Sequence, residues 1–438
     1  MLKKDTAYKL FMVAWVYFLL ITIIDFHYPL GKNYIPIINF SKIQNFKFIP
    51  FVIIALLILP LNAYKSQINH HLFKIFLVIT ILIISGFVSA SLSENPRVGF
   101  AFMTRFTIYF LILLYLVFAL KYFAGLNEFL IKSFVYVNLF IIIACIMDFY
   151  VPAFHQLLVD YFGRPLVKHS FIKYNDEILM RPMGFITESN LAALSITLAS
   201  LLMLLNNKKF NQYFRICFYV LGSFALGMLV SRSSLIFCII ILIYLFFSKA
   251  VTRKELYIYA AIYIIVQLIT PQTQSRILQF FDKKQMQEEV SVGRPLIWEA
   301  DFNAFRTNPV FGVGPDCFFH SSQDYLRQVL ISKNINIDNP SEPNYFEINS
   351  VNPHSLILAI LTEGGIIGFI IFIILILLIF LYYLKKKLYT SMVFFINLLI
   401  AAAVSSYAPY YTYFLLISVI FFILSLNNMC IKDKDSNV

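Results

Sequence analysis

The sequence predicts an all-α polytopic membrane protein with about 12 transmembrane helices and a large outer loop between the ninth and tenth. Three observations predict this class: 60% of the 438 residues are hydrophobic, 13% are charged, and the mean hydropathy is +0.77. The core of a soluble protein cannot hide so much apolar surface. Each crossing of a hydrocarbon core about 30 Å thick needs roughly 17 to 25 mainly apolar residues.

Apolar segments of this length follow one another along most of the chain. Lys3, Lys4 and Lys9 precede the first segment as in a signal peptide, but Asp25 closes it and no small-residue cleavage site follows. The first segment is therefore expected to be a retained anchor. The predicted spans are 10–25, 48–64, 72–91, 103–120, 130–150, 187–206, 213–230, 233–249, 255–271, 364–383, 389–406 and 410–427.

The distribution of lysine and arginine predicts the orientation of these spans. Cationic loops resist translocation, so the loops rich in these residues are expected to be cytoplasmic. The pattern fits cytoplasmic termini, and it attributes most of the formal charge of +12 to topology rather than to a nucleic-acid-binding surface. Residues 1–271 then hold nine spans and an outer loop at 152–186, residues 272–352 form the large periplasmic loop, and residues 353–438 hold three spans and a cytoplasmic tail.

The large outer loop is expected to be folded, because it contains a helix with recognisable start and stop signals. Pro295 suits the first helical position, and Asn308-Pro309 should end the helix. Residues 312–315, Gly-Val-Gly-Pro, are typical of a tight turn. The apolar positions of this helix are Ile297, Phe302 and Phe305.

Arg294 stands at the expected start of this helix, four residues before Trp298 and on the same face. A cation there meets the positive end of the helix dipole unless an anion lies between them. A guanidinium group beside free backbone N–H groups makes a good phosphate or pyrophosphate site. The alternative for Arg294 is an ordinary solvated loop arginine.

Arg232 lies in S-R-S-S (231–234), between two apolar runs and on the expected outer side. Arginine at an outer membrane edge runs against the topogenic bias, and ionisable residues at this depth usually line a polar cavity. The alternative is a side chain that snorkels to the interface. The same reasoning applies more weakly to Arg181, which precedes the sixth span with Glu188 and Asn190 at its head.

Polar residues also precede the tenth predicted span. Asn352 is expected to cap a helix whose first position is Pro353, which places His354 in the first turn. There the helix dipole lowers the pKa of an imidazole and favours the neutral form, which can accept a proton. Gly364-Gly365 should break this short helix before the long span begins. A packed or hydrogen-bonded histidine is the alternative.

The residues above form an ordered series of motifs: S-R-S-S, R-x-x-x-W, P-V-F-G-V-G and P-H-S-L-I-L-A-I-L-T-E-G-G-I-I-G. This series resembles the O-antigen ligase and polymerase superfamily, the WaaL/Wzy group. The resemblance is strongest from about 181 to 375, and the number of spans and the large outer loop agree with it. One departure is Ser355 after His354, where the family often has asparagine.

The resemblance implies a metal-independent, inverting glycosyltransferase that uses a glycan carried by undecaprenyl pyrophosphate at the outer leaflet. Arg232 and Arg294 would hold the pyrophosphate, and His354 would deprotonate an acceptor hydroxyl. No metal or cofactor is expected: the outer loops lack D-x-D, for which Glu299-Ala-Asp301 is a weak substitute, and the five cysteines form no C-x-x-C pair. Candidate substrate-binding residues are Arg181, Glu188, Asn190, Trp298, Asn352, Ser355 and Glu363.

Three functions remain open from the sequence. A Wzy-type polymerase, which joins lipid-linked repeat units into O-antigen or capsule, is favoured because such sequences vary widely. A WaaL-type ligase, which moves finished glycan to lipid A core, is the main alternative, and a flippase or transporter is less favoured because no internal repeat is visible. The expected setting is the bacterial cytoplasmic (inner) membrane with the active site on the periplasmic face. Expected partners are lipid-linked oligosaccharide, membrane lipid, a chain-length regulator and a flippase, but not nucleic acid.

Overall fold

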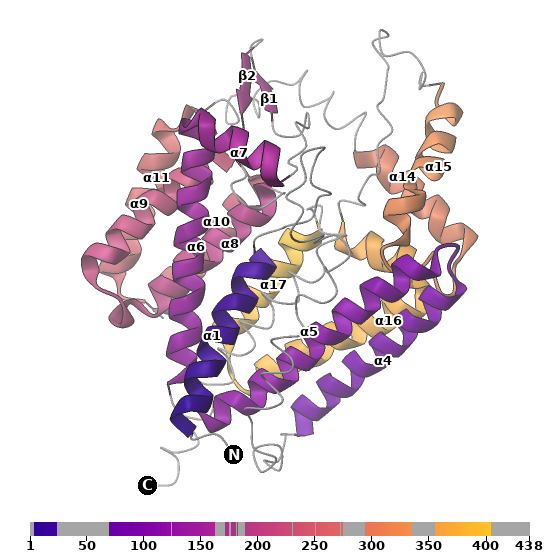
Figure 1. The fold of residues 1–438 in the computed structure, drawn as a ribbon, viewed down its shortest axis with the longest axis horizontal. Helices are drawn as coiled ribbons and strands as arrows, with labels where there is room; N and C mark the ends of the chain where they lie inside the picture. Colours follow the sequence, from indigo (N-terminus) through magenta and orange to yellow (C-terminus); the bar gives the residue numbers. More distant parts are fainter. Residues whose placement is uncertain are drawn as a thin grey trace. The chain divides into compact units, whose positions relative to one another are not determined.

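A computed structural model describes most of the chain as two compact units. Unit 1 comprises Met1–Ala63 and Ala119–Lys283, and unit 2 comprises Tyr64–Phe118 and Lys284–Val438 (Figure 1). The predicted spans 48–64 and 410–427 lie outside the described residues. The structure describes residues 4–23, 70–123, 125–162, 171–174, 177–180, 182, 189–229, 231–249, 251–271, 273–274, 294–334 and 355–403.

Unit 1 is built mainly from helices, and several packed pairs are separated in sequence by another helix. Helix α8 packs against α6 and α9, and α9 packs against α11. One buried polar pair joins two helices of this bundle: the Ser195 hydroxyl of α8 donates to the side-chain oxygen of Asn138 of α6 at 2.8 Å. The elements are α1 (Lys4–Ile23), α6 (Leu126–Tyr150), α7 (Pro152–Phe162), α8 (Ser189–Leu205), the 3₁₀ turn η3 (Asn207–Lys209), α9 (Gln212–Leu229), α10 (Arg232–Ser248) and α11 (Arg253–Ile269).

A short β-hairpin accompanies the helices that the sequence predicted. Strands β1 (Phe171–Tyr174) and β2 (Glu177–Met180) are antiparallel, with Phe171 opposite Met180. Both strands fall in the loop predicted at 152–186. Each contains large apolar residues, and the two residues between the strands are Asn and Asp, types that favour tight hairpin turns. Apart from this hairpin, the elements of the described residues are helical.

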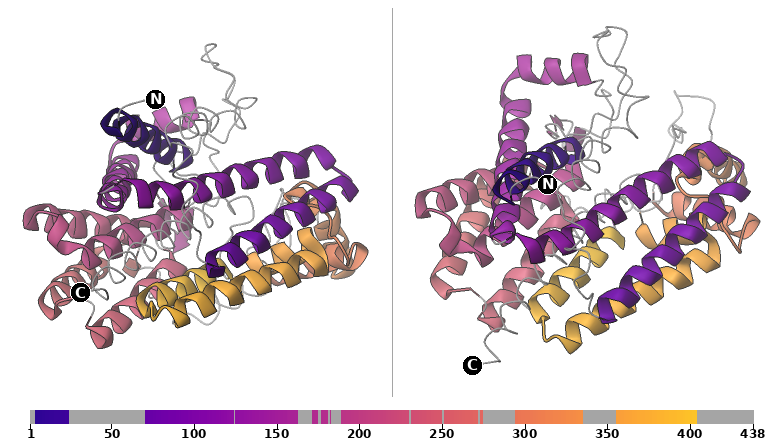
Figure 2. Two further views of the ribbon diagram at one scale, coloured as in Figure 1. Left: turned by 90° about the horizontal axis from the view of Figure 1, so that it is seen from below. Right: turned by 60° about the horizontal axis from the view of Figure 1, so that its bottom comes forward.

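Unit 2 contains a long helical bundle and a smaller helical pair. Helices α4 and α16 lie side by side along much of their length (Figures 1 and 2). Helices α14 and α15 pack on each other through a core formed by Leu296, Ala300, Ala304, Val313, Cys317, Phe318, Leu326, Val329 and Leu330. The helices are α4 (His70–Leu92), α5 (Pro96–Tyr122), whose last turn extends past the unit boundary, α14 (Arg294–Thr307), α15 (Cys317–Ser332), α16 (Leu356–Lys385) and α17 (Tyr389–Ala403).

Several helices have the length and composition of membrane spans. Within the described residues, five are long and apolar enough to cross a bilayer, which supports a multi-pass membrane protein. They are His70–Leu92, Pro96–Leu120, Leu126–Tyr150, Gln212–Leu229 and Leu356–Lys385. The total of about 12 spans stays a prediction.

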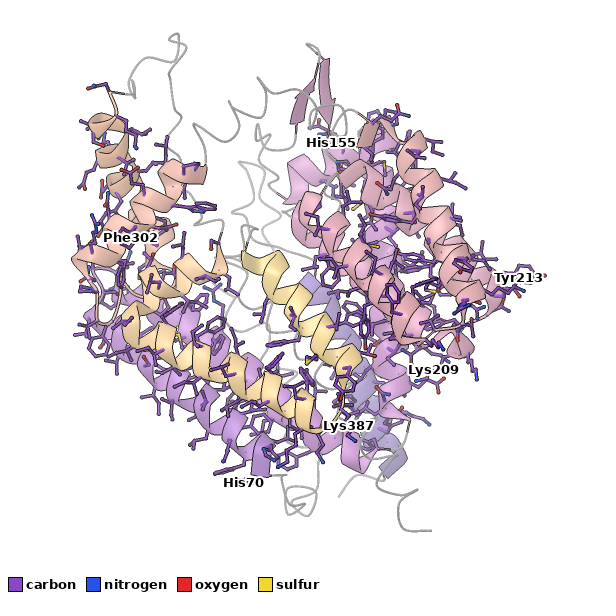
Figure 3. All side chains as sticks on the ribbon, turned by 180° about the vertical axis from the view of Figure 1, so that it is seen from behind. His70, His155, Lys209, Tyr213, Phe302 and Lys387 are labelled. Carbon is purple, nitrogen blue, oxygen red and sulfur yellow. The ribbon has the colours of Figure 1, made fainter. Side chains whose placement is uncertain are left out.

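Within each unit, labelled lysines of the predicted cytoplasmic segments lie at the end opposite residues of the predicted outer loops (Figure 3). In unit 2, His70 and Lys387 lie at the end opposite Phe302 (Figure 3). In unit 1, Lys209 lies at the end opposite His155 (Figure 3). Lys209 and Lys387 belong to segments predicted to be cytoplasmic, whereas Phe302 and His155 belong to the predicted outer loops. The two ends of each unit therefore agree with the predicted orientation, and the side of the membrane that each end faces stays a prediction.

Candidate active site

The tenth predicted span is broken, as its glycines predict. Gly365 has φ 62° and ψ −168°, so α16 consists of a short first segment and a long second one joined at a kink. A helix break leaves carbonyl groups without partners before it and N–H groups without partners after it. Such groups are costly next to hydrocarbon unless other parts of the protein satisfy them.

The loop after α14 supplies the missing partners. Before the kink, the Thr362 carbonyl accepts from the Val313 N–H at 2.9 Å, and the Glu363 carbonyl accepts from the Gly314 N–H at 3.1 Å. After the kink, the Ile366 N–H donates to the Pro309 carbonyl at 2.9 Å. A further bond joins the Ile367 N–H to the Val310 carbonyl at 3.3 Å. The P-V-F-G-V-G and T-E-G-G motifs are therefore two halves of one backbone assembly.

Glycine is required where the two backbones approach. Gly312 has φ 74°, and a Cβ there would lie 2.4 Å from the carbonyl carbon of Glu363. A Cβ on Gly365 would lie 2.3 Å from the Val310 oxygen. The Ser89 hydroxyl of α4 lies 2.6 Å from the Phe311 carbonyl oxygen and 3.0 Å from that of Glu363, so its single proton serves one of them at a time. This assembly, residues 309–314 with 362–367 and Ser89, is named the kink junction below.

The Glu363 side chain stabilises the start of α15. It is 4% exposed, and its carboxyl group lies near the backbone N–H groups of Asp316 and Phe318, while its Oε1 has no hydrogen-bond partner within the described residues. Asp316, the N-cap residue, has φ 62° and makes no capping bond with its own side chain. Glu363 therefore takes the role that an N-cap side chain usually has. The Asp316 carboxylate instead faces Arg105 of α5 at 3.5 Å.

Asp301 is a second buried carboxyl group, on the side of α14 that faces α16. The Thr362 hydroxyl donates to the Asp301 backbone carbonyl at 3.2 Å, which ties the two helices together. The Asp301 side chain is 0% exposed, and within the described residues neither of its oxygens has a hydrogen-bond partner. Burial raises the pKa of Asp301 well above its ordinary value, which favours the neutral acid.

The start of α16 differs from the prediction. The helix begins at Leu356, and Ser355 is its N-cap, with its hydroxyl accepting from the Leu358 N–H at 3.4 Å. The prediction of Asn352 as the cap of this helix is therefore wrong, because a serine nearer the apolar run meets the requirement for a capping oxygen. Asn352 and His354 lie outside the described residues. Because α16 begins at Leu356, His354 precedes this helix in sequence. The predicted effect of the helix dipole on the pKa of His354 required a position in the first turn and therefore loses its basis.

The start of α14 agrees with the prediction. The helix runs from Arg294 to Thr307, so Arg294 is its first residue, although the structure does not describe its side chain. Trp298, one turn later, is 39% exposed. Glu299 pairs with Lys333 at 2.8 Å on the surface while Asp301 is buried, so the two carboxylates of the weak D-x-D substitute have different surroundings.

The remaining candidate residues belong to unit 1. Arg232 is the first residue of α10, as its place between two apolar runs suggests. Asn190 is the second residue of α8. The structure does not describe the side chain of either residue. Arg181 and Glu188 lie outside the described residues. Arg232 belongs to unit 1 and Arg294 to unit 2, so their joint binding of one pyrophosphate stays a prediction.

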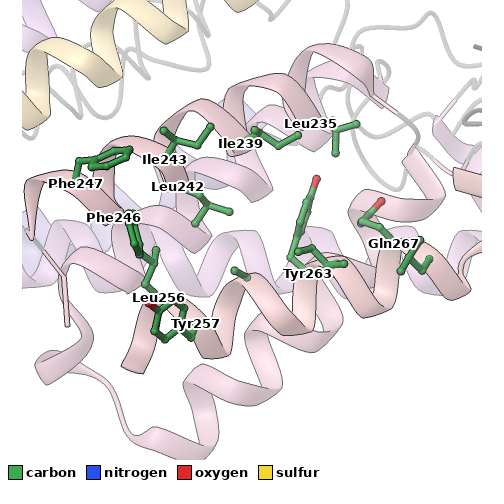
Figure 4. A pocket seen from close by; sticks show the side chains of 13 residues that line it. Leu235, Ile239, Leu242, Ile243, Phe246, Phe247, Leu256, Tyr257, Tyr263 and Gln267 are labelled. Carbon is green, nitrogen blue, oxygen red and sulfur yellow. The ribbon is translucent and has the colours of Figure 1, made fainter. Parts of the chain in front are cut away.

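An apolar groove begins one turn after Arg232. Side chains of α10 and α11 line it, from Leu235 to Phe247 along α10, and its volume is about 460 Å³ (Figure 4). Along α10 this stretch spans about 18 Å at 1.5 Å per residue. Tyr257, Tyr263 and Gln267 bring the few polar groups of the lining.

The sequence did not indicate Ser89 and Arg105 as parts of this site, and it suggested Asp301 only as half of a weak D-x-D substitute. The helical period did contain a signal for Asp301, because it falls one residue after Ala300 and three before Ala304, on the apolar face of α14. Nothing in the sequence around Ser89 or Arg105 marks a contact more than 200 residues away.

The helices define a multi-pass membrane protein. Residues 217–373 match the family model described as Wzy_C, O-antigen ligase. This match confirms the resemblance to the O-antigen ligase and polymerase superfamily. The family implies glycosyltransferase-type chemistry on lipid-linked oligosaccharides. No curated protein matched the chain.

Proposed function

We propose that the protein is a Wzy-type polysaccharide polymerase, which transfers an undecaprenyl-pyrophosphate-linked glycan onto another lipid-linked repeat unit at the outer leaflet. The observation that carries this proposal is the kink junction within the Wzy_C segment. It ties the end of the helix that begins with Arg294 to the helix that follows His354 in sequence, so the two helices next to these proposed catalytic residues are joined by backbone hydrogen bonds.

The chemistry requires little beyond cations and a base. A polyprenyl pyrophosphate is a good leaving group, so Arg294 and Arg232 need only hold it and stabilise the negative charge that develops as the glycosidic bond breaks. His354 takes the proton of the acceptor hydroxyl as this oxygen attacks the anomeric carbon, and inversion follows from attack on the opposite face. The sequence offers no metal-binding motif for this step, and the proposal remains metal-independent.

The apolar groove supports a lipid-linked donor. Arg232 begins α10, where backbone N–H groups and a guanidinium side chain favour a phosphate group. The groove starts at Leu235 and continues along the same helix. A charged head beside an apolar channel matches the chemistry of a pyrophosphate attached to a polyprenyl chain.

The ligase remains the second candidate, because the matching family model is described as O-antigen ligase. The departure from His-Asn to His354-Ser355 favours the polymerase. Both functions place both termini in the cytoplasm and the site at the periplasmic face of the inner membrane, with a chain-length regulator and a flippase as candidate partners. The flippase function itself has no motif in its favour.

Deletion of the gene tests these functions by the glycan that accumulates. Loss of a polymerase should leave surface glycan of a single repeat unit on a gel, and re-expression of the intact chain should restore the polymer. Free lipid-linked polymer would indicate the ligase instead. Repeat units retained on the cytoplasmic side would indicate a flippase and contradict both transferase functions.

A further inference from the structure

Helix α14 presents an exposed aromatic and cationic face. Trp298, Phe302 and Arg306 are spaced four residues apart, so they share one face of the helix, with about 6 Å between successive positions. Trp298 is 39% exposed, Phe302 is 43% exposed, and Arg306 is also exposed. These three residues are named the α14 stripe. Arg294 precedes them by the same interval.

Packing does not account for this stripe. The opposite side of α14 forms the core with α15 through Leu296, Ala300 and Ala304. Helix α14 is not among the five helices found long and apolar enough to span a bilayer within the described residues, so the two exposed aromatic rings are not the lipid-facing side of one of those spans. Adjacent exposed aromatic side chains commonly mark a binding surface.

Arg306 adds hydrogen-bond donors to the aromatic surface. Its guanidinium carbon lies 4.6 Å from the centroid of the Phe302 ring, which holds the cation over the aromatic face. Within the described part of the chain Arg306 forms no ion pair, so its N–H groups can donate to a ligand. Phe305 lies beside this pair, with its ring centroid 6.0 Å from that of Phe302.

We propose that the α14 stripe binds the saccharide chain of a substrate. The aromatic rings would stack on the apolar faces of sugar rings, and Arg306 would donate to hydroxyl groups or to the carboxylates of acidic sugars. The choice of a glycan rests on the proposed function: a sugar chain whose pyrophosphate lies at Arg294 can extend along the same face of α14. Phe302 and Arg306 are thereby assigned to substrate binding together with Trp298.

The tryptophan content of the chain allows this binding to be measured directly. The chain has two tryptophans, and Trp15 is buried with its indole N–H donating to Ser133 at 3.1 Å. A ligand on the α14 stripe should therefore change the fluorescence of Trp298 and leave that of Trp15 as a constant background. The probe is oligosaccharide released by mild acid from the surface polysaccharide of cells that carry the gene, added to the full-length protein in detergent.

Saturable fluorescence change is expected for the intact protein. Phe302→Ala and Arg306→Ala should each weaken binding at least about tenfold, which corresponds to about 1.4 kcal/mol. Arg327→Ala, an exposed arginine on α15, is the matched control and should bind as the intact protein does. Equal affinity of the intact protein and both stripe variants would overturn the proposal, as would a response to phospholipid vesicles without any response to the oligosaccharide.

Glycan length provides the second readout. Phe302→Ala and Arg306→Ala should shorten the polymer in cells while the protein accumulates normally. Unchanged polymer in both variants, together with unchanged binding, would refute the stripe while the polymerase function stands. If instead deletion of the gene leaves the glycan unaltered, the proposed function fails, and the fluorescence titration still decides whether the stripe binds sugar.

Discussion

The kink junction predicts a sharp difference between two neighbouring glycines of α16. Gly365 has a left-handed φ, and a Cβ there would lie 2.3 Å from the Val310 oxygen and 2.6 Å from the Gly312 nitrogen. At Gly364 no atom lies within 4 Å of the added Cβ, and the backbone is helical. Gly365→Ala should therefore disrupt the junction, whereas Gly364→Ala should leave it intact.

The magnitude follows from three contributions. A non-glycine residue in the conformation of Gly365 costs on the order of 1–3 kcal/mol. Separation of the clashing backbones removes the bonds of Ile366 to Pro309 and of Ile367 to Val310, and each polar group left buried without a partner costs about 1–3 kcal/mol. Gly365→Ala should thus lose at least about 3 kcal/mol of stability. Gly364→Ala should be neutral or slightly stabilising, since alanine favours helix by up to about 1 kcal/mol.

Thermal stability of the purified full-length protein provides the assay. The fraction that stays monodisperse in detergent after heating is compared for the intact chain and both variants, and polymer made in cells is compared on a gel. Gly365→Ala should melt well below the other two and make little polymer. Equal melting of the two alanine variants would show that the bonds across the kink contribute little, and would refute the role given to the junction.

Other consequences of the site can be measured in the same way. Because burial raises the pKa of Asp301, the folded protein keeps a proton that the unfolded chain releases, so stability should fall as pH rises above about 3.9, the ordinary pKa of aspartate. In the Asp301→Asn variant the melting temperature should decline less with pH, and at neutral pH the variant should be at least as stable as the intact protein. A lower melting temperature of the variant at neutral pH would mean that the Asp301 carboxylate is paired. Glu363→Ala should destabilise by about 1–3 kcal/mol because the backbone N–H groups at the start of α15 lose the carboxyl group near them, whereas Glu363→Gln, which retains an acceptor oxygen, should recover much of the loss in the same melting assay. In spheroplasts, an impermeant maleimide should label a cysteine at Asn334 and not one at Lys387, and the reverse pattern would invert the predicted orientation.

Local signals predicted local structure well. The helix beginning at Arg294 and ending before Asn308-Pro309 matches α14, because a proline at the first position and an Asn-Pro stop act on the backbone within a few residues. The break at Gly364-Gly365 is confirmed for the same reason. At the start of α16, two capping residue types stood three positions apart, and the sequence did not reveal that Ser355 rather than Asn352 would cap the helix.

Long-range features were not predictable from the sequence. The kink junction depends on backbone groups, which every residue carries, so no side-chain pattern marks the pairing of Val313 with Thr362. The capping of α15 by Glu363 joins elements about fifty residues apart through one carboxyl group. The motifs suggested substrate contact for Glu363, whereas its burial against α15 favours a positioning role.

The central claim, that this chain polymerises lipid-linked repeat units, is tested most directly with purified components. Full-length protein is incubated with undecaprenyl-pyrophosphate-linked repeat units in lipid vesicles, and the products are resolved by length. The account predicts longer lipid-linked glycans and free undecaprenyl pyrophosphate in proportion to the bonds formed, with at least about tenfold slower reaction for Arg294→Lys, because lysine cannot reproduce the paired hydrogen bonds of arginine to a pyrophosphate. Substrate left unchanged by folded, intact protein, or polymer formed equally fast by Arg294→Lys, would contradict it.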